Sequence, residues 1–120
     1  MWFYEDFLAK FDPQARKQAG VYYTPIPVVK CQVRLVDDLL RNRFGQRNGF
    51  GSKSVVTLDP ATGSGTYPLA VIDQAVDAAW KEGGKVKAAQ IGRNLTENVI
   101  AFELLPGCLL YTSDAADDRI

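Results

Sequence analysis

Residues 59–66 combine an acidic side chain with a turn of small residues, a pattern that suits the binding of a charged cofactor. The segment lies between a strand-like apolar run at 55–58 and an amphipathic run at 67–80 and reads Asp59-Pro60-Ala61-Thr62-Gly63-Ser64-Gly65-Thr66. Glycine leaves no side chain to hold a ligand away from the main chain. The first turn of a helix offers N–H groups to an anion. The pattern therefore predicts a turn that binds a carboxylate or phosphate, with an acidic group beside it.

The turn does not match the two common phosphate-binding motifs. A P-loop needs a lysine followed by Ser or Thr directly after its second glycine, and no lysine stands at that place after Gly63 or Gly65. The dinucleotide motif Gly-x-Gly-x-x-Gly is half present, but Pro68 replaces its third glycine. Both motifs are therefore disfavoured, and another charged cofactor is expected.

Three segments together resemble the adenine-N6 DNA methyltransferases. Residues 59–67 are similar to the family's S-adenosylmethionine motif, Asp-Pro-Ala/Cys-Cys/Thr-Gly-Ser/Thr-Gly-aromatic. Residues 20–25, Gly-Val-Tyr-Tyr-Thr-Pro, resemble its N-terminal cofactor motif, and residues 101–104, Ala-Phe-Glu-Leu, resemble its acidic second-strand motif. Residues 3–8 look like members found in restriction–modification enzymes. The resemblance covers about residues 3–107 and implies S-adenosylmethionine as the cofactor.

The resemblance also implies which residues bind the cofactor. Asp59 is expected near the methionine ammonium, and Thr24 with the turn N–H groups near the methionine carboxylate. Glu103 is expected to accept the ribose hydroxyls, as an acidic second-strand residue does in dinucleotide sites. The separation of Asp59 from Glu103 exceeds the ~20 residues typical of those sites, so residues 83–95 are expected to be an insertion. The full expected set is Tyr23, Thr24, Asp59, Ala61, Thr62, Gly63, Gly65 and Glu103.

No catalytic residue is expected within this sequence. The family uses an Asn/Asp-Pro-Pro-aromatic motif to bind the flipped adenine, and Asp12-Pro13 and Asp59-Pro60 both lack the second proline. We therefore expect a cofactor-binding fragment of a site-specific DNA methyltransferase, which would contact double-stranded DNA through other regions. The alternatives are an RNA or protein methyltransferase and a non-catalytic binding module. The sequence downstream, or a test of cofactor binding, would separate them.

The elements needed to position these residues follow from the apolar periodicity. Apolar residues recur at three- and four-residue steps over 28–44, which predicts an amphipathic helix. A glycine-rich loop, a strand at 55–58, a helix to about residue 82 and a strand at 98–104 follow, and a short helix is predicted at 2–10. Strand, helix and parallel strand form a βαβ unit.

The predicted fold is thus α/β, a partial Rossmann-like methyltransferase fold preceded by N-terminal helices. The expected organisation is an N-terminal helical region at 1–50, the start of the cofactor-binding α/β domain at 51–107 and a non-native tail at 108–120. Two strands cannot cover both faces of a parallel sheet. Apolar strand residues are therefore expected to be under-covered, namely Val55, Val56, Leu58, Ile100 and Phe102.

Composition narrows the function classes. The 120 residues contain two cysteines and no histidine, which excludes a zinc finger, a Cys/His nucleophile and a Ser–His triad within them. No metal is expected. No apolar run reaches membrane-spanning length and no signal peptide is visible, so no membrane partner and a cytoplasmic location are expected. Formal charge is zero overall, with a basic excess in residues 1–53 and an acidic excess in 54–120.

Residues 108–117 differ in kind from the rest. The segment reads Cys-Leu-Leu-Tyr-Thr-Ser-Asp-Ala-Ala-Asp. Its back-translation resembles a transposase-type sequencing-library adapter. If so, the natural sequence breaks off near Gly107, and the chain is expected to be a fragment.

Overall fold

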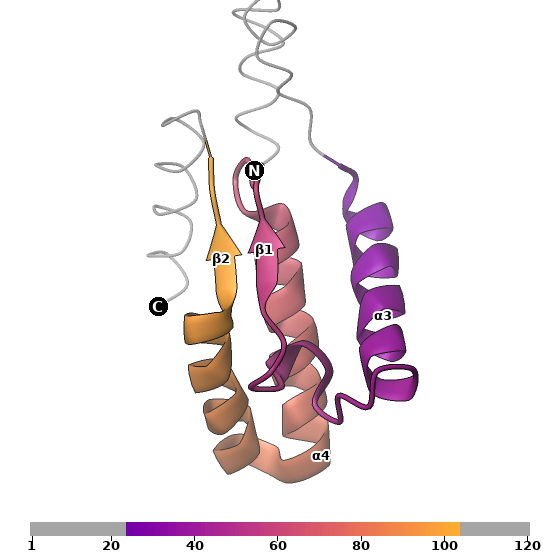
Figure 1. Ribbon diagram of the computed structural model, residues 1–120, viewed down its shortest axis with the longest axis vertical. Helices are drawn as coiled ribbons and strands as arrows, with labels where there is room; N and C mark the ends of the chain where they lie inside the picture. The colour runs from indigo at the N-terminus through magenta and orange to yellow at the C-terminus, as the bar shows by residue number, and fades with distance from the viewer. Residues whose placement is uncertain (1–23, 104–120) are drawn as a thin grey trace, which may run out of the picture.

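The computed structural model describes residues 24–103 (Figure 1). Within them the chain forms helix α3 (Ile26–Asn42), a 3-10 turn η1 (Gly49–Gly51), strand β1 (Thr57–Asp59), helix α4 (Thr66–Asn98) and strand β2 (Val99–Ala101). The order helix, strand, helix, strand is compatible with the predicted α/β class. The predicted helix at 2–10 and the tail at 108–120 lie outside the described residues.

Helix α3 begins directly after Pro25, and Pro27 lies in its first turn. Proline is tolerated there because the first N–H groups of a helix have no intrahelical partner. Val29 and Val33 are buried at a four-residue spacing, and so is Asp37 one turn further on. The helix starts and ends two residues earlier than the periodicity predicted.

The two strands pair in parallel and in register. Leu58 lies opposite Ile100, and Asp59 lies opposite Ala101. Both strands run towards the end of the molecule at which α3 and α4 begin (Figure 1). The carboxyl ends of the strands and the amino ends of two helices therefore meet at one edge, where α/β folds bind ligands.

Helix α4 is interrupted at Gly84, whose φ of 70° and ψ of −156° are not helical. The first half runs away from the strand ends and the second half runs back, leading directly into β2 (Figure 1). The predicted helix end at Gly83-Gly84 is therefore the place where the helix breaks. The expected insertion at 83–95 lies around this break and in the second helical half, which accounts for the long separation of Asp59 from Glu103.

The core lies between α3, η1 and the two halves of α4. Its buried apolar side chains are Val29, Val33, Phe50, Val71, Ala75, Ala79, Ala88, Ile91 and Leu95. Phe50 comes from a segment that the sequence predicted as a polar loop, and it is 6% exposed. The loop is held from the second half of α4, where the side chains of Asn94 and Asn98 donate to the carbonyl oxygens of Gly51 and Lys53.

The strands contribute little to this core. Val56, Leu58, Ile100 and Phe102 are between 40% and 63% exposed, and Val55 is half-buried. The expectation of under-covered strand residues is confirmed for the first four. Among residues 24–103, no helix is both long and apolar enough to span a membrane.

Candidate functional site

The candidate site lies where the turn after β1 meets the chain that leaves β2. The N–H of Phe102 donates to the carbonyl oxygen of Asp59 at 2.9 Å, which continues the parallel ladder beyond β2. The N–H of Thr62 then donates back to the carbonyl oxygen of Phe102 at 2.9 Å. The main chain of the turn is thereby fixed against the end of the second strand.

Glu103 contacts the glycine-rich turn directly. Its Oε2 atom accepts a hydrogen bond from the N–H of Gly63 at 2.5 Å. Gly63 has a φ of 59° and Gly65 a φ of 91°, a left-handed backbone that glycine adopts without the steric cost of a side chain. Two residues singled out from separate motifs, Gly63 and Glu103, are thus brought together by the fold.

The two carboxylate oxygens of Asp59 differ in their hydrogen bonding. Its Oδ1 accepts from the N–H of Ala61 at 3.2 Å. Its Oδ2 is buried, as is the Oγ1 of Thr62, and neither atom has a hydrogen-bond partner among residues 24–103. Buried polar atoms are nearly always paired in folded proteins, with protein, water or ligand. Both oxygens can accept hydrogen bonds, which fits a ligand that brings N–H or O–H groups to the end of β1.

The remaining turn residues use their N–H groups within the protein. The four N–H groups of Ala61, Thr62, Gly63 and Gly65 each donate to a protein oxygen. A ligand carboxylate that used one of them would have to displace the partner that it has here. The side chain of Ala61 is exposed, whereas Thr62 and Gly65 are buried.

The N-terminal cofactor motif is only partly described. Tyr23 lies outside the described residues, and Thr24 is half-buried two residues before α3. Ile26 of α3 and Thr66 of α4 line one groove, so the two helices begin side by side. The Tyr67 hydroxyl also donates to Oε1 of Gln32, which links the first turn of α4 to α3. No motif indicated this contact of Gln32, because it depends on how the two helices pack.

A smaller apolar pocket of about 390 Å³ adjoins the site. Asp59 and Tyr67 lie at its wall, together with Leu58 and Ile100 of the strands and Val36 of α3. It places apolar surface next to Asp59. Among residues 24–103, no group of three or more His, Cys, Asp or Glu side chains could hold a metal ion.

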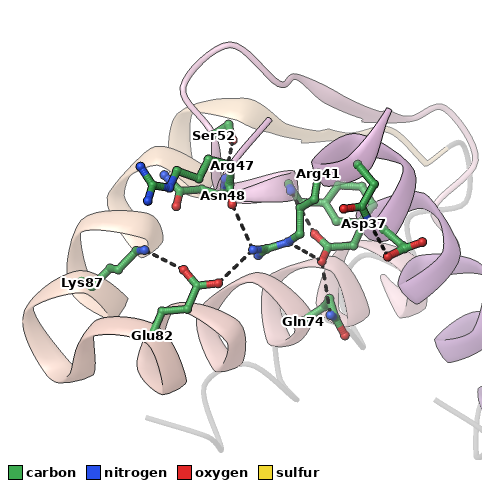
Figure 2. A network of polar contacts seen from close by, with 11 residues as sticks. Asp37, Arg41, Arg47, Asn48, Ser52, Gln74, Glu82 and Lys87 are labelled. Carbon is green, nitrogen blue, oxygen red and sulfur yellow. Dashed lines mark hydrogen bonds and ion pairs between the residues drawn. The ribbon is translucent and has the colours of Figure 1, made fainter. Parts of the chain in front are cut away.

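A polar network holds α3 against α4 towards the other end of the helices (Figure 2). Asp37, 5% exposed, accepts from Arg41 Nε at 2.9 Å, from the Phe50 N–H at 3.3 Å and from Gln74 Nε2 at 3.4 Å. Arg41 also bonds Glu82 Oε1 at 2.9 Å. The network therefore ties α3 to η1 and to the first half of α4.

The network extends across the break in α4. Lys87 Nζ lies 2.6 Å from Glu82 Oε2, which joins the second half of the helix to the first. The hydrogen bond from Lys87, and then that from Arg41, hold the pKa of Glu82 below its usual value, although its partial burial opposes this. Glu82 is therefore ionised at neutral pH and links both basic partners.

Comparison with known proteins gives the family. The family model described as N-6 DNA Methylase matches residues 2–101, which includes the motifs at residues 20–25 and 59–67 and ends at the first residue of the third motif. A search of curated proteins and a search of solved structures found no match. This match over most of the sequence agrees with the turn after β1 and its contact with Glu103. The chain therefore belongs to the N-6 DNA methylase family.

Proposed function

We propose that this chain is the S-adenosylmethionine-binding part of a site-specific methyltransferase that acts on adenine N6 in double-stranded DNA. The observation that carries the proposal is the convergence of Asp59, the Gly63 turn and Glu103 at the carboxyl ends of two parallel strands. Membership of the N-6 DNA methylase family supports the reaction class. A role in restriction–modification and a cytoplasmic location belong to the same proposal.

The residues present fit this cofactor. Asp59 Oδ2 is a buried acceptor without a partner among the described residues, and a methionine ammonium group would supply the N–H donors it lacks. Glu103 is positioned beside the turn and would accept from the ribose hydroxyls. The bound cofactor would supply an activated methyl group on its sulfonium, so these residues serve to bind and orient it.

The methyl acceptor would be bound elsewhere in the protein. The 120 residues contain no Asn/Asp-Pro-Pro-aromatic motif, the family's means of binding a flipped adenine. We therefore assign no catalytic residue to this sequence. Binding of the cofactor, rather than methylation, is the activity to measure on this chain.

Isothermal titration calorimetry with S-adenosylmethionine on the 120-residue chain tests the proposal. Asp59→Ala is expected to weaken binding about tenfold or more, because a hydrogen bond to a charged group contributes about 1.5–3 kcal/mol. Glu103→Gln keeps the shape of the side chain and is expected to weaken binding as well. Asp77→Ala is the matched control, because Asp77 pairs with exposed Lys81 on α4 and does not line the pocket beside Asp59.

The controls fix what each result means. Binding by the folded chain that is unchanged in Asp59→Ala would remove Asp59 from the site. A folded wild-type chain that binds no S-adenosylmethionine would overturn the proposal. Titration with NAD and ATP is expected to give no heat, because neither phosphate-binding motif is present.

A further inference from the structure

A second and larger groove lies between α3 and the first half of α4. It has a volume of about 730 Å³, and its floor is apolar, with Val29 and Val33 from α3 and Leu69 and Ala70 from α4. The groove shares Thr66 with the turn after β1, and no residue of β1 or β2 lines it. The proposed function assigns nothing to it.

One end of the groove is formed by Trp80, which is 56% exposed. A tryptophan buries 150–250 Å² when covered, and exposed apolar surface of this kind around a groove marks an interaction site. Charges of both signs border the floor, with Lys30 and Arg34 on α3 and Asp73 and Asp77 on α4. An occupant should therefore present apolar residues to the floor and carry charges of both signs.

We propose that residues 2–10 of this same chain bind in the groove as a short amphipathic helix. The periodicity places Phe3, Phe7 and Leu8 on one helical face. Glu5 and Asp6 supply acidic groups, and Lys10 supplies a basic one. The segment thus has the apolar face and both signs of charge that the groove requires.

The dimensions agree with this occupant. A helix over residues 2–10 is about 13 Å long, and the groove-lining part of α3 from Ile26 to Arg34 has the same number of residues. Residues 11–23 connect the two and span up to about 43 Å when extended. Asp12-Pro13 and Gly20 provide turn residues at which the chain can reverse direction. The family match begins at residue 2, so it includes both this segment and the helices that line the groove.

Tryptophan fluorescence tests the proposal on the full chain without depending on cofactor binding. The chain has two tryptophans, so Trp2→Phe leaves Trp80 as the single emitter. In this background Phe7→Asp should release the segment and raise the acrylamide quenching constant of Trp80 at least twofold. The matched control is Phe44→Asp, because Phe44 is 70% exposed and does not line the groove. Equal quenching constants with and without Phe7→Asp would overturn the proposal.

A second variant approaches the contact from the groove side. Ala70→Glu places a charge on the floor and is expected to speed trypsin cleavage after Lys10 severalfold, while circular dichroism at 222 nm shows that the helices persist. Cleavage at the wild-type rate in a folded Ala70→Glu chain would contradict the proposal. Trp80 protection that disappears on hundredfold dilution would show that a second copy occupies the groove, and would also overturn it.

Discussion

Gly49 is the residue that lets the loop approach the buried carboxylate of Asp37. It has a φ of +56°, and a Cβ atom built on it would lie 1.9 Å from Asp37 Oδ1. The neighbouring Phe50 N–H donates to the same oxygen, and the Phe50 ring enters the core. The main chain at Gly49 can therefore lie this close to the Asp37 carboxylate because residue 49 has no side chain.

Gly49→Ala is therefore expected to destabilise the fold by about 3 kcal/mol. The left-handed backbone costs a non-glycine residue about 1–2 kcal/mol, and displacing a buried, hydrogen-bonded carboxylate adds a similar amount. Urea unfolding followed by circular dichroism measures the change. Gly45→Ala is the control, because Gly45 has a φ of +64° with no atom within 4 Å of the added Cβ, and only the backbone cost is expected. Equal losses in the two variants would remove Asp37 from the explanation.

The site residues differ in how far the sequence could predict them. Asp59, Gly63 and Glu103 were found from the resemblance of their motifs to a family, and the fold places them at one edge. The hydrogen bond between Gly63 and Glu103 could not be predicted, because it depends on the register of β2 beside β1. Their roles towards a cofactor remain predictions.

At the scale of elements, Glu82 joins three helical segments through two ion pairs. Its side chain is 42% exposed, and it contacts Arg41 of α3 and Lys87 of the second half of α4. Exposed pairs contribute little individually, about 1 kcal/mol or less. Their effect should be visible mainly as a dependence of stability on pH.

Because the folded pKa of Glu82 is lowered, its contribution is present above the usual carboxyl range and is lost as pH falls through the lowered value. Glu82→Gln should therefore be less stable than wild type at pH 6, by less than about 1 kcal/mol, and the difference should be smaller at pH 3. Denaturant unfolding at both pH values measures this. Asp77→Asn is the control, since Asp77 and Lys81 are 69% and 74% exposed. A difference that grows on acidification would contradict the assignment.

The break in α4 makes a second prediction at this scale. Gly84 adopts φ 70° and ψ −156°, a region that only glycine enters without strain, so Gly84→Ala should cost about 1–3 kcal/mol. Gly92 is helical in the same element with open space around it, so Gly92→Ala should stabilise by about 0.5–1 kcal/mol. Thermal unfolding of both variants gives the comparison. Stabilisation by Gly84→Ala would mean that the helix runs straight through this position.

Local patterns predicted the elements better than their packing. The three- and four-residue spacing gave α3 to within two residues, and the two glycines marked the break in α4. The role of η1 was missed because its polar and glycine-rich sequence is typical of exposed loops, although Phe50 is buried under α4. A single apolar residue has no periodicity, and so its burial is decided only by tertiary contacts.

At the scale of the whole molecule, the core lies among the helices and the sheet is left exposed. Leu58 and Ile100 face each other across the two strands and are 58% and 40% exposed. Exposed apolar strands are templates for association between chains. We expect the 120-residue chain to self-associate at micromolar concentration and to bind the dye ANS.

Leu58→Lys combined with Ile100→Glu should reduce this association, because the pair places opposite charges directly across the strands. Size-exclusion chromatography with light scattering measures the change in mass. Val86→Lys is the control, because Val86 is 81% exposed on α4, away from the sheet. If Val86→Lys reduced the mass as much as the double variant, the sheet would not be the associating surface.

The direct passage from α4 into β2 has a consequence for how this domain can change in length. Val99 is both the cap of the helix and the first residue of the strand, so no loop separates them. One residue removed between Lys85 and Asn98 would turn the rest of the helix by about 100° and slide β2 by one position, which inverts its faces. Glu103 would then leave Gly63. Insertions and deletions should therefore be found at the Gly84 bend and be absent from the helix that follows it.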